Sequence, residues 1–273
     1  MPAAKPARAV DAHAHVFPAL SSATGAAVPA ARYRPAYAAR LDDWRALWPT
    51  AGIDHGVLTQ VSFLGTDNGE LLRAIARDPA RLRGVARVEP GIGDSALAAL
   101  AAGGVRAARL NLSGETDFSV YGTPAWRALL ERVEALGWHV EVFTDAGRLP
   151  AIAAALGTST VPVVFDHFGN PGHDAASIER SFEAAAALAA RRSVAVKLSA
   201  PYRLGGADPA PLARRWLEIV GPEGLLWGSD WPWTRHEAGR DYAQLRSQLD
   251  GWLPPSIVPA VLWDNAARVY RFD

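Results

Sequence analysis

The sequence alternates between short apolar runs and segments with helical spacing of apolar residues, and this alternation constrains the fold most strongly. The apolar runs predict buried strands at residues 10–17, 56–63, 83–88, 104–112, 138–144, 161–166, 194–198 and 225–228. Helices are expected at 41–48, 68–77, 94–102, 124–136, 148–156, 178–190, 212–220, 242–249 and 257–269. Eight strands alternating with helices predict an α/β protein with a (β/α)8 TIM barrel.

An open doubly wound sheet is the alternative fold for the same alternation. Such a sheet would carry a glycine-rich phosphate-binding turn after the first strand. The sequence has Asp11-Ala-His-Ala-His15 at that place, which favours the barrel.

Length and composition fit one soluble enzyme-sized domain. The 273 residues, 49% of them hydrophobic, are within the range of a single barrel, so we expect a short tail at 1–8 and one domain at 9–273. Basic and acidic residues balance at 28 each, which argues against a nucleic-acid or acidic-membrane partner. The chain contains no cysteine, which excludes disulfides, thiolate zinc sites and cysteine nucleophiles. With neither a signal-peptide pattern nor a membrane-length apolar run, we expect a cytoplasmic protein.

Polar residues collect at the C-terminal ends of the predicted strands, where barrels of this type hold their active sites. His13 and His15 end the first strand, and their spacing of two places them on one face. Two such imidazoles can bind a metal, or act together on a carbonyl oxygen or a water. The later strand ends carry Gln60 and Ser62, Arg109 and Asn111, Asp166 and His167, Lys197 and Ser199, and Ser229 and Asp230.

Each of these residues also has a structural interpretation. His167 could hydrogen-bond the backbone, Asp230 could shape a turn, and Arg109 and Arg203 could pair with surface acids. We assign structural roles to His55 and His139, which are predicted to lie at the opposite rim. The roles of His173 and His236, which are predicted to lie in loops, stay open.

The motifs together resemble the amidohydrolase superfamily, within the amidohydrolase-2 group, and there the lactonases similar to 2-pyrone-4,6-dicarboxylate lactonase. The resemblance covers nearly the whole chain. It rests on Asp11-Ala-His-Ala-His-Val-Phe17, residues 60–68, 105–111 and 137–140, Asp166-His-Phe-Gly169, residues 196–203, Trp227-Gly-Ser-Asp-Trp-Pro232 and residues 264–268.

The resemblance implies a barrel of the metal-dependent-hydrolase type and a set of roles. Asp230 would be the base that activates water, while histidines polarise the lactone carbonyl. Those histidines are His13, His15 and His167; the residues that would hold substrate are Ser62, Arg109, Arg203 and, more loosely, Tyr33 in the long loop at 18–40.

Two departures from the lactonase pattern bear on the substrate. Ser113-Gly114-Glu115 stands where a further arginine is expected, and Phe143 stands where a tyrosine is expected. An acid in place of an arginine would repel a dicarboxylate, so the sequence supports lactonase chemistry more than that particular pyrone.

The cofactor expectation is either no metal or a single divalent ion such as Zn²⁺ on His13, His15, His167 and Asp230. A binuclear site is not expected, because binuclear members of the family use a lysine or glutamate from strand four and a histidine from strand five. Here strand four ends in Arg109 and Asn111, and strand five ends in Thr144 and Asp145. The expected reaction is the hydrolysis of a carboxylated or hydroxylated lactone, such as a pyrone-dicarboxylate or sugar-acid lactone, by water that Asp230 activates. A lactone isomerase and a metal-dependent decarboxylase of the same superfamily are the alternatives, and a non-catalytic binding protein is the least favoured. The expected partner is a small lactone or carboxylate, and assembly into a homo-oligomer stays open.

Overall fold

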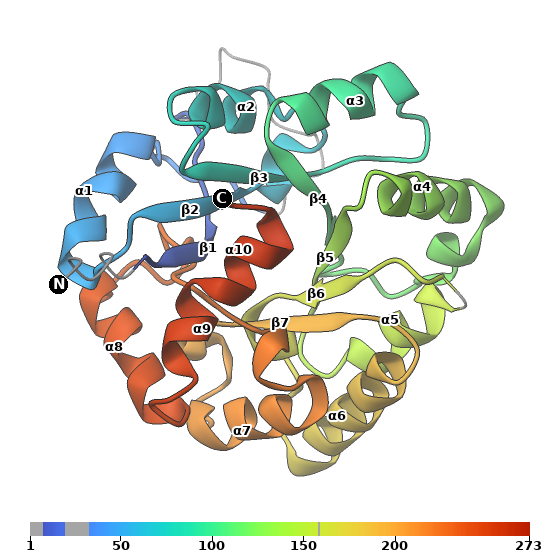
Figure 1. Cartoon of the computed structure of the whole chain (residues 1–273). Coiled ribbons are helices and arrows are strands. Elements are labelled where there is room, and N and C mark those ends of the chain that lie inside the picture. The colour runs from blue at the N-terminus through green and yellow to red at the C-terminus, as the bar shows by residue number, and fades with distance from the viewer. Residues whose placement is uncertain (1–7, 20–32, 158) are drawn as a thin grey trace, which may run out of the picture.

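The computed structural model describes residues 8–19, 33–157 and 159–273, and within them it forms a (β/α)8 barrel. The eight parallel strands are β1 Val10–Ala14, β2 His55–Thr59, β3 Leu82–Ala86, β4 Val105–Asn111, β5 His139–Phe143, β6 Val163–Phe165, β7 Val194–Ser199 and β8 Leu225–Gly228. Each strand pairs with the next in sequence, and Figure 1 shows the ring that results. The predicted barrel is confirmed.

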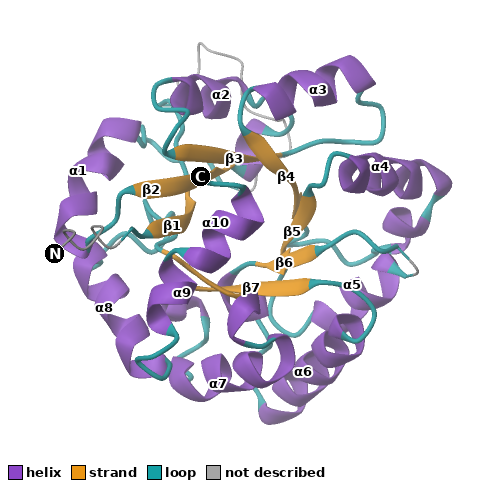
Figure 2. Cartoon of the chain, viewed as in Figure 1, coloured by secondary structure: helices purple, strands orange, loops and turns teal. Residues whose placement is uncertain are grey.

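Helices cover the outside of the barrel, and the last of them covers one of its ends (Figure 2). They are α1 Leu41–Ala51, α2 Gly69–Ala76, α3 Asp94–Ala102, α4 Pro124–Ala135, α5 Leu149–Leu156, α6 Ala175–Ala189, α7 Pro209–Val220, α8 Tyr242–Trp252, α9 Val258–Leu262 and α10 Asp264–Tyr270. Their apolar faces pack on the strands. In α7, for example, Leu212, Ala213 and Trp216 are buried.

The ring closes where the segment after β8 meets β1. Ala14 and Trp231 form a parallel bridge, and the Asp230 N–H donates to the His13 carbonyl at 2.8 Å. Gly228 permits this approach, because a Cβ there would lie 2.6 Å from the Cβ of His13. Barrel closure therefore brings Asp230 beside the histidines of β1.

The N-terminal end of the barrel is plugged by the last helix, α10, which lies across the ring in Figure 1. Tyr270 and Phe272 pack there against apolar residues of the barrel interior, including Val10, Val57 and Val164. The plug closes the end of the barrel opposite to Asp230.

Several boundaries differ from those predicted. The sixth strand is Val163–Phe165 rather than 161–166, since Pro162 has no N–H to donate to a strand ladder. The second strand ends at Thr59, so Ser62 lies in a 3₁₀ turn, η1 (Ser62–Leu64), rather than at the end of a strand. The helix expected at 257–269 is two helices, α9 and α10, which meet at Trp263. Of the long loop expected at 18–40, residues 20–32 lie outside the described residues, as do 1–7 of the predicted tail.

Candidate active site

A local irregularity in β1 turns both histidines into the barrel. Val10 and Ala12 pack with the interior residues, whereas Ala14 packs with the outer core. The pairing register with β2 shifts between Asp11 and Ala14, and this shift changes which residues face inward. His13 and His15 consequently share the inner face, as predicted, with their ring centroids 4.9 Å apart.

Asp11 holds this irregular strand in place. Its buried carboxylate accepts hydrogen bonds from the Ser229 N–H at 2.8 Å, from Trp44 Nε1 at 3.0 Å and from the Tyr242 hydroxyl at 2.9 Å. Burial raises the pKa of Asp11, and the hydrogen bonds from Ser229 oppose that rise. Asp11 thus joins β1, the segment after β8 and two outer helices, and it supports the site without facing it.

Three imidazoles converge on one oxygen of Asp230. The Nε2 atoms of His13, His15 and His167 lie 3.6, 3.4 and 3.7 Å from its Oδ1. His167 comes from the turn η3 (His167–Gly169) directly after β6, and its Nδ1 lies 2.8 Å from the Ser199 hydroxyl. The structure therefore brings together all four residues that the sequence predicted to be catalytic.

The other oxygen of Asp230 is held by the turn η4 (Pro201–Arg203). Oδ2 accepts hydrogen bonds from the Tyr202 hydroxyl at 2.7 Å and from Nε and Nη2 of Arg203 at 3.1 and 3.0 Å. Burial alone would raise the pKa of Asp230, but Arg203 and the histidines hold it well below its usual range. Asp230 is therefore an ionised carboxylate with one anchored and one available oxygen.

His13 and His167 are neutral at physiological pH. Burial lowers the pKa of His13 to about 4, although the neighbouring Asp166 opposes that effect. Burial also lowers the pKa of His167 well below its ordinary value. Neutral imidazoles can donate a hydrogen bond, accept one or ligate a metal, as a site for carbonyl chemistry requires.

A buried ionic group lies beneath the histidines, and sequence reasoning missed most of it. The Lys197 ammonium contacts Glu141, lies 3.2 Å from Asp166 and lies 3.0 Å from His13 Nδ1. Burial alone would raise the pKa of Asp166, but Lys197 and His13 hold it well below its usual range. Alternation along β5 and β7 is the signal that could have identified Glu141 and Lys197 as inward-facing, but only barrel closure shows that they meet.

The site opens into a cavity of about 180 Å³ at the C-terminal ends of the strands. Seven of the eight residues predicted for the site line this cavity, and the eighth, His13, is fully buried behind His15 and Asp230. Arg109 is buried and donates to the Gln60 carbonyl, with Nη2 3.9 Å from Asp166. The lining comprises His15, Tyr33, Val61, Ser62, Phe63, Arg109, Asn111, Ser113, Phe143, His167, Arg203, Asp230, Thr234 and Arg235.

Arg235 is a lining residue that the sequence interpretation did not identify. It gives the cavity a third guanidinium beside those of Arg109 and Arg203. Its guanidinium carbon lies 6.0 Å from the centre of the Tyr33 ring, and Glu237 accepts a hydrogen bond from the Tyr33 hydroxyl at 3.4 Å. The loop after β8 is thus tied to the loop before α1 across the cavity mouth.

The structure also places the two departures from the lactonase pattern. Glu115 does not line the cavity; it accepts hydrogen bonds from the Tyr121 hydroxyl at 3.0 and 3.2 Å. The expected repulsion of a dicarboxylate by Glu115 therefore has no direct basis in the cavity. Phe143 does line it, with its ring centroid 5.2 Å from that of His167, and offers an apolar wall where a hydroxyl was expected.

The donor set fits a single divalent metal in type and in spacing. His13 Nε2, His15 Nε2 and Asp230 Oδ1 are separated by 3.3 to 3.6 Å. Tetrahedral zinc ligands at about 2.0–2.2 Å from the metal lie about 3.3–3.6 Å from one another. A second group of this kind is formed by His13, Asp166 and His167.

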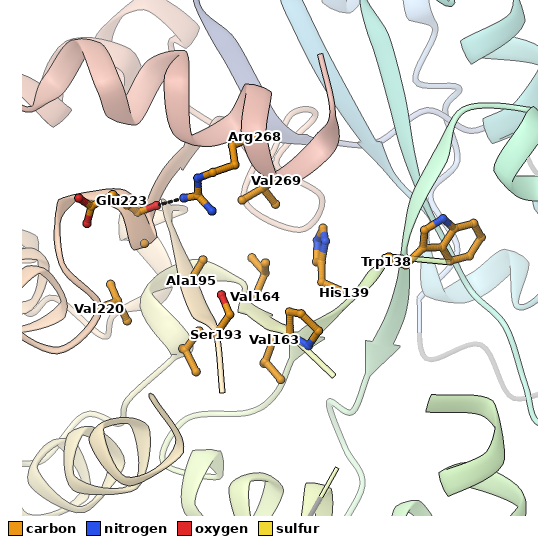
Figure 3. Close-up of a pocket in the computed structure, with 14 residues that line it drawn as sticks. Trp138, His139, Val163, Val164, Ser193, Ala195, Val220, Glu223, Arg268 and Val269 are labelled. Atoms are coloured by element: carbon orange, nitrogen blue, oxygen red, sulfur yellow. Dashed lines mark hydrogen bonds between the residues drawn. The ribbon is translucent and has the colours of Figure 1, made fainter. Parts of the chain in front are cut away.

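A larger cavity, of about 480 Å³, lies at the opposite rim (Figure 3). Its walls combine apolar side chains such as Val163 and Val164 with polar groups such as Ser193, and Arg268 donates to the Glu223 carbonyl. His139 lines this cavity, which agrees with its predicted place at the far rim. Because both three-residue groups of histidine and carboxylate found among the described residues lie at the smaller cavity, we assign the chemistry to that one.

Comparison with known proteins finds relatives that match nearly the whole chain. A 2-pyrone-4,6-dicarboxylate hydrolase from Comamonas testosteroni is 33% identical to this chain over 291 residues, covering 97% of the chain and 90% of the relative. A 4-sulfomuconolactone hydrolase from Rhizobium radiobacter is 28% identical over 276 residues with the same coverage. The solved structure of a candidate 2-pyrone-4,6-dicarboxylic acid hydrolase from Pseudomonas putida superposes with a TM-score of 0.86 at 36% identity, covering 97% of this chain and 98% of the other.

Within the described residues, no helix has the length and apolar character needed to cross a bilayer. The amidohydrolase family model matches residues 10–272. Since this match spans nearly all of the sequence, and includes every strand of the barrel, the chain belongs to the amidohydrolase family.

Proposed function

We propose that this protein hydrolyses a carboxylated lactone to the open-chain acid, with Asp230 as the base that activates water. The observation that carries the proposal is that the two oxygens of the Asp230 carboxylate have different partners. Arg203 and Tyr202 hold Oδ2, while Oδ1 faces three imidazoles at the floor of the cavity. The lactone hydrolases among the relatives support the same reaction class.

In the proposed reaction, a water beside Oδ1 of Asp230 attacks the ester carbonyl carbon and gives its proton to the carboxylate. His13, His15 and His167 border the place where the carbonyl oxygen acquires negative charge, and the N–H groups of neutral His13 and His167 stabilise that charge. The tetrahedral intermediate collapses by breaking the bond between the carbonyl carbon and the ring oxygen. Protonated Asp230 returns its proton to that oxygen, which restores the carboxylate.

Asp230 is a weak base in the free protein because its pKa is low, so its pKa has to rise when substrate binds. Arg203 is the main group that lowers it, and its side chain is 21% exposed at the cavity. A substrate carboxylate would draw this guanidinium into a bidentate pair. Weaker contact with Arg203 raises the pKa of Asp230, so that it becomes a stronger base in the complex.

The cationic lining supports a substrate that carries a carboxylate. Arg109, Arg203 and Arg235 contribute three guanidiniums to a cavity of about 180 Å³. Ser62, Asn111 and Tyr33 supply further hydrogen-bonding groups at its walls. An uncharged lactone of the same size would leave these cations without an anionic partner and should bind more weakly.

A divalent metal would be held by His13, His15, His167 and Asp230. When bound, it would supply Lewis-acid polarisation of the carbonyl oxygen or of the attacking water. The proposed roles of Arg109 and Arg203 in orienting the substrate are the same in either case.

The proposal is tested by offering the protein matched lactones with and without a ring carboxylate and following acid release in a pH-stat. We expect hydrolysis of the carboxylated lactones with a kcat/KM about 100-fold above that of the uncharged ones, equivalent to about 2.7 kcal/mol. Release of carbon dioxide distinguishes a metal-dependent decarboxylase from a lactonase, and parallel assays with EDTA show whether the activity requires a metal. Mass analysis for the addition of one water distinguishes hydrolysis from isomerisation. Failure to open any carboxylated lactone would contradict the proposal.

A further inference from the structure

Lys197 reaches from β7 across the closed interior of the barrel to the back of His13. It is fully buried, and its ammonium contacts Glu141 of β5 and lies 3.2 Å from Asp166. Its third partner is Nδ1 of His13, at 3.0 Å. This contact is on the side of the imidazole that faces away from the cavity.

The direction of this hydrogen bond follows from the groups at its two ends. A lysine ammonium has three N–H donors and no acceptor, so His13 Nδ1 must accept. A neutral imidazole carries one donor and one acceptor, so the proton of His13 is then on Nε2.

The contact between His15 and Thr59 is a second indication of the direction of these hydrogen bonds. The Thr59 carbonyl can only accept, and it lies 2.7 Å from His15 Nδ1, which therefore donates. In an imidazole that carries one proton, the Nε2 of His15 is then the acceptor, and His13 Nε2 lies 3.3 Å from it. The hydrogen bonds thus run in one direction, from Lys197 through His13 and His15 to Thr59.

Asp166 is the competing partner. Its Oδ1 lies 3.1 Å from His13 Nδ1 and would favour the opposite tautomer, with the proton on Nδ1. However, neither oxygen of Asp166 has a hydrogen-bond partner of good geometry among the described side chains. Because Lys197 donates to His13 Nδ1, this nitrogen accepts a hydrogen bond and cannot also donate one to Asp166.

We propose that Lys197 is a positioning residue that fixes His13 as the Nε2–H tautomer and so directs its proton toward the cavity. In the proposed function, on which this inference rests, that proton is one of the donors that stabilise the developing oxyanion. His13 Nε2 also lies 3.6 Å from Oδ1 of Asp230, so the same proton faces the base. A metal on His13 Nε2 would require this proton to leave, so Lys197 also favours the state in which His13 acts as a donor.

The tautomer can be measured without any substrate. Long-range ¹H–¹⁵N spectra of histidine-labelled protein at pH 8 distinguish Nδ1–H from Nε2–H imidazoles, and H13Q identifies the His13 signals among the seven histidines. We expect His13 to be Nε2–H in the wild-type protein. An Nδ1–H pattern for His13 would overturn the proposal, whatever the activity of the enzyme.

The variants K197M and K197M/E141Q test the role of the lysine. The double variant removes the buried carboxylate that Lys197 neutralises, so it avoids leaving Glu141 as an uncompensated charge. E141Q is the matched control, because it keeps the ammonium and is expected to keep the Nε2–H tautomer. In folded K197M/E141Q we expect His13 to become Nδ1–H, bonded to Asp166, and kcat on an accepted lactone to fall about 100-fold relative to E141Q, with KM changed less than threefold.

An unchanged His13 tautomer in folded K197M/E141Q would overturn the assignment of Lys197. If neither lysine variant folds, the wild-type and E141Q spectra still decide the direction of the hydrogen bonds. Because these spectra need no turnover, failure of the lactonase proposal would leave this readout intact.

Discussion

Arg203 binds only one oxygen of Asp230, with hydrogen bonds of 3.0 and 3.1 Å to Oδ2, and leaves Oδ1 to the three histidines. This arrangement keeps the carboxylate ionised and fixes its orientation. It also links the residue that holds the base to the cavity where a substrate carboxylate would bind.

Removal of Arg203 should shift the pH dependence of the reaction. Burial would raise the pKa of Asp230, and Arg203 is the largest influence that lowers it. Asp230 must be ionised to accept a proton, so activity falls as the pH drops through its pKa. In R203M that pKa rises, and the acid limb of the kcat/KM profile is expected to move to higher pH. R215Q, which breaks an exposed ion pair with Glu179, should leave the limb in place; an identical limb in R203M would contradict the account.

Arg235 should contribute binding rather than chemistry. Arg235 lines the cavity, and its guanidinium has no hydrogen bond or ion pair with Asp230 or with the three described histidines that face it, so it can attract a substrate carboxylate without affecting the base. In R235Q we expect KM for a carboxylated lactone to rise about tenfold, equivalent to about 1.4 kcal/mol, with kcat nearly unchanged. An uncharged lactone should show no change in KM. R214Q, on the exposed face of α7, is the control, and equal effects on charged and uncharged lactones would refute a carboxylate contact.

The fold could be predicted from the sequence because a barrel repeats one local pattern. Each strand is a short apolar run, and each helix has apolar residues at helical spacing. The alternation of these two patterns therefore predicted the order of strands and helices. The boundaries that shifted depend on local chemistry, such as the missing N–H of Pro162 and the side chain of Gln60, which donates to Gly65 and Asp67 and shapes the turn after β2.

The site was predictable in part, for a related physical reason. The sequence places four residues at the C-terminal ends of predicted strands, and a parallel barrel brings those ends together at one rim. These residues are His13, His15, His167 and Asp230. Lys197 and Glu141 were less visible, because their meeting inside the barrel depends on closure of the sheet. Arg235 lies in a loop after β8, where no strand period fixes the direction of a side chain.

Burial of neutral His13 should make the protein less stable in mild acid. The pKa of His13 falls from 6.5 to about 4 on folding, so the unfolded chain binds more protons between these values. The contribution of His13 to the free energy of unfolding is therefore fully present above pH 6.5 and is lost as the pH falls toward 4. For His13 alone the loss is about 3 kcal/mol.

Urea unfolding at pH 7 and at pH 4.5 of the wild-type protein and of H13Q isolates this contribution. The free energy of unfolding should fall more steeply with acid in the wild-type protein than in H13Q, which has no imidazole to titrate at this position. Parallel pH dependence in the two proteins would show that His13 is not buried in its neutral form.

The most direct test of the central claim is the turnover of D230N on a lactone that the wild-type protein opens. Asparagine keeps the size of the side chain but cannot take a proton from water at neutral pH, so kcat is expected to fall about a thousandfold. Circular dichroism should show that D230N is folded, and D250N, which breaks only a surface pair with Arg246, should retain wild-type turnover. If folded D230N keeps kcat within tenfold of the wild-type value, Asp230 is not the base and the account is wrong.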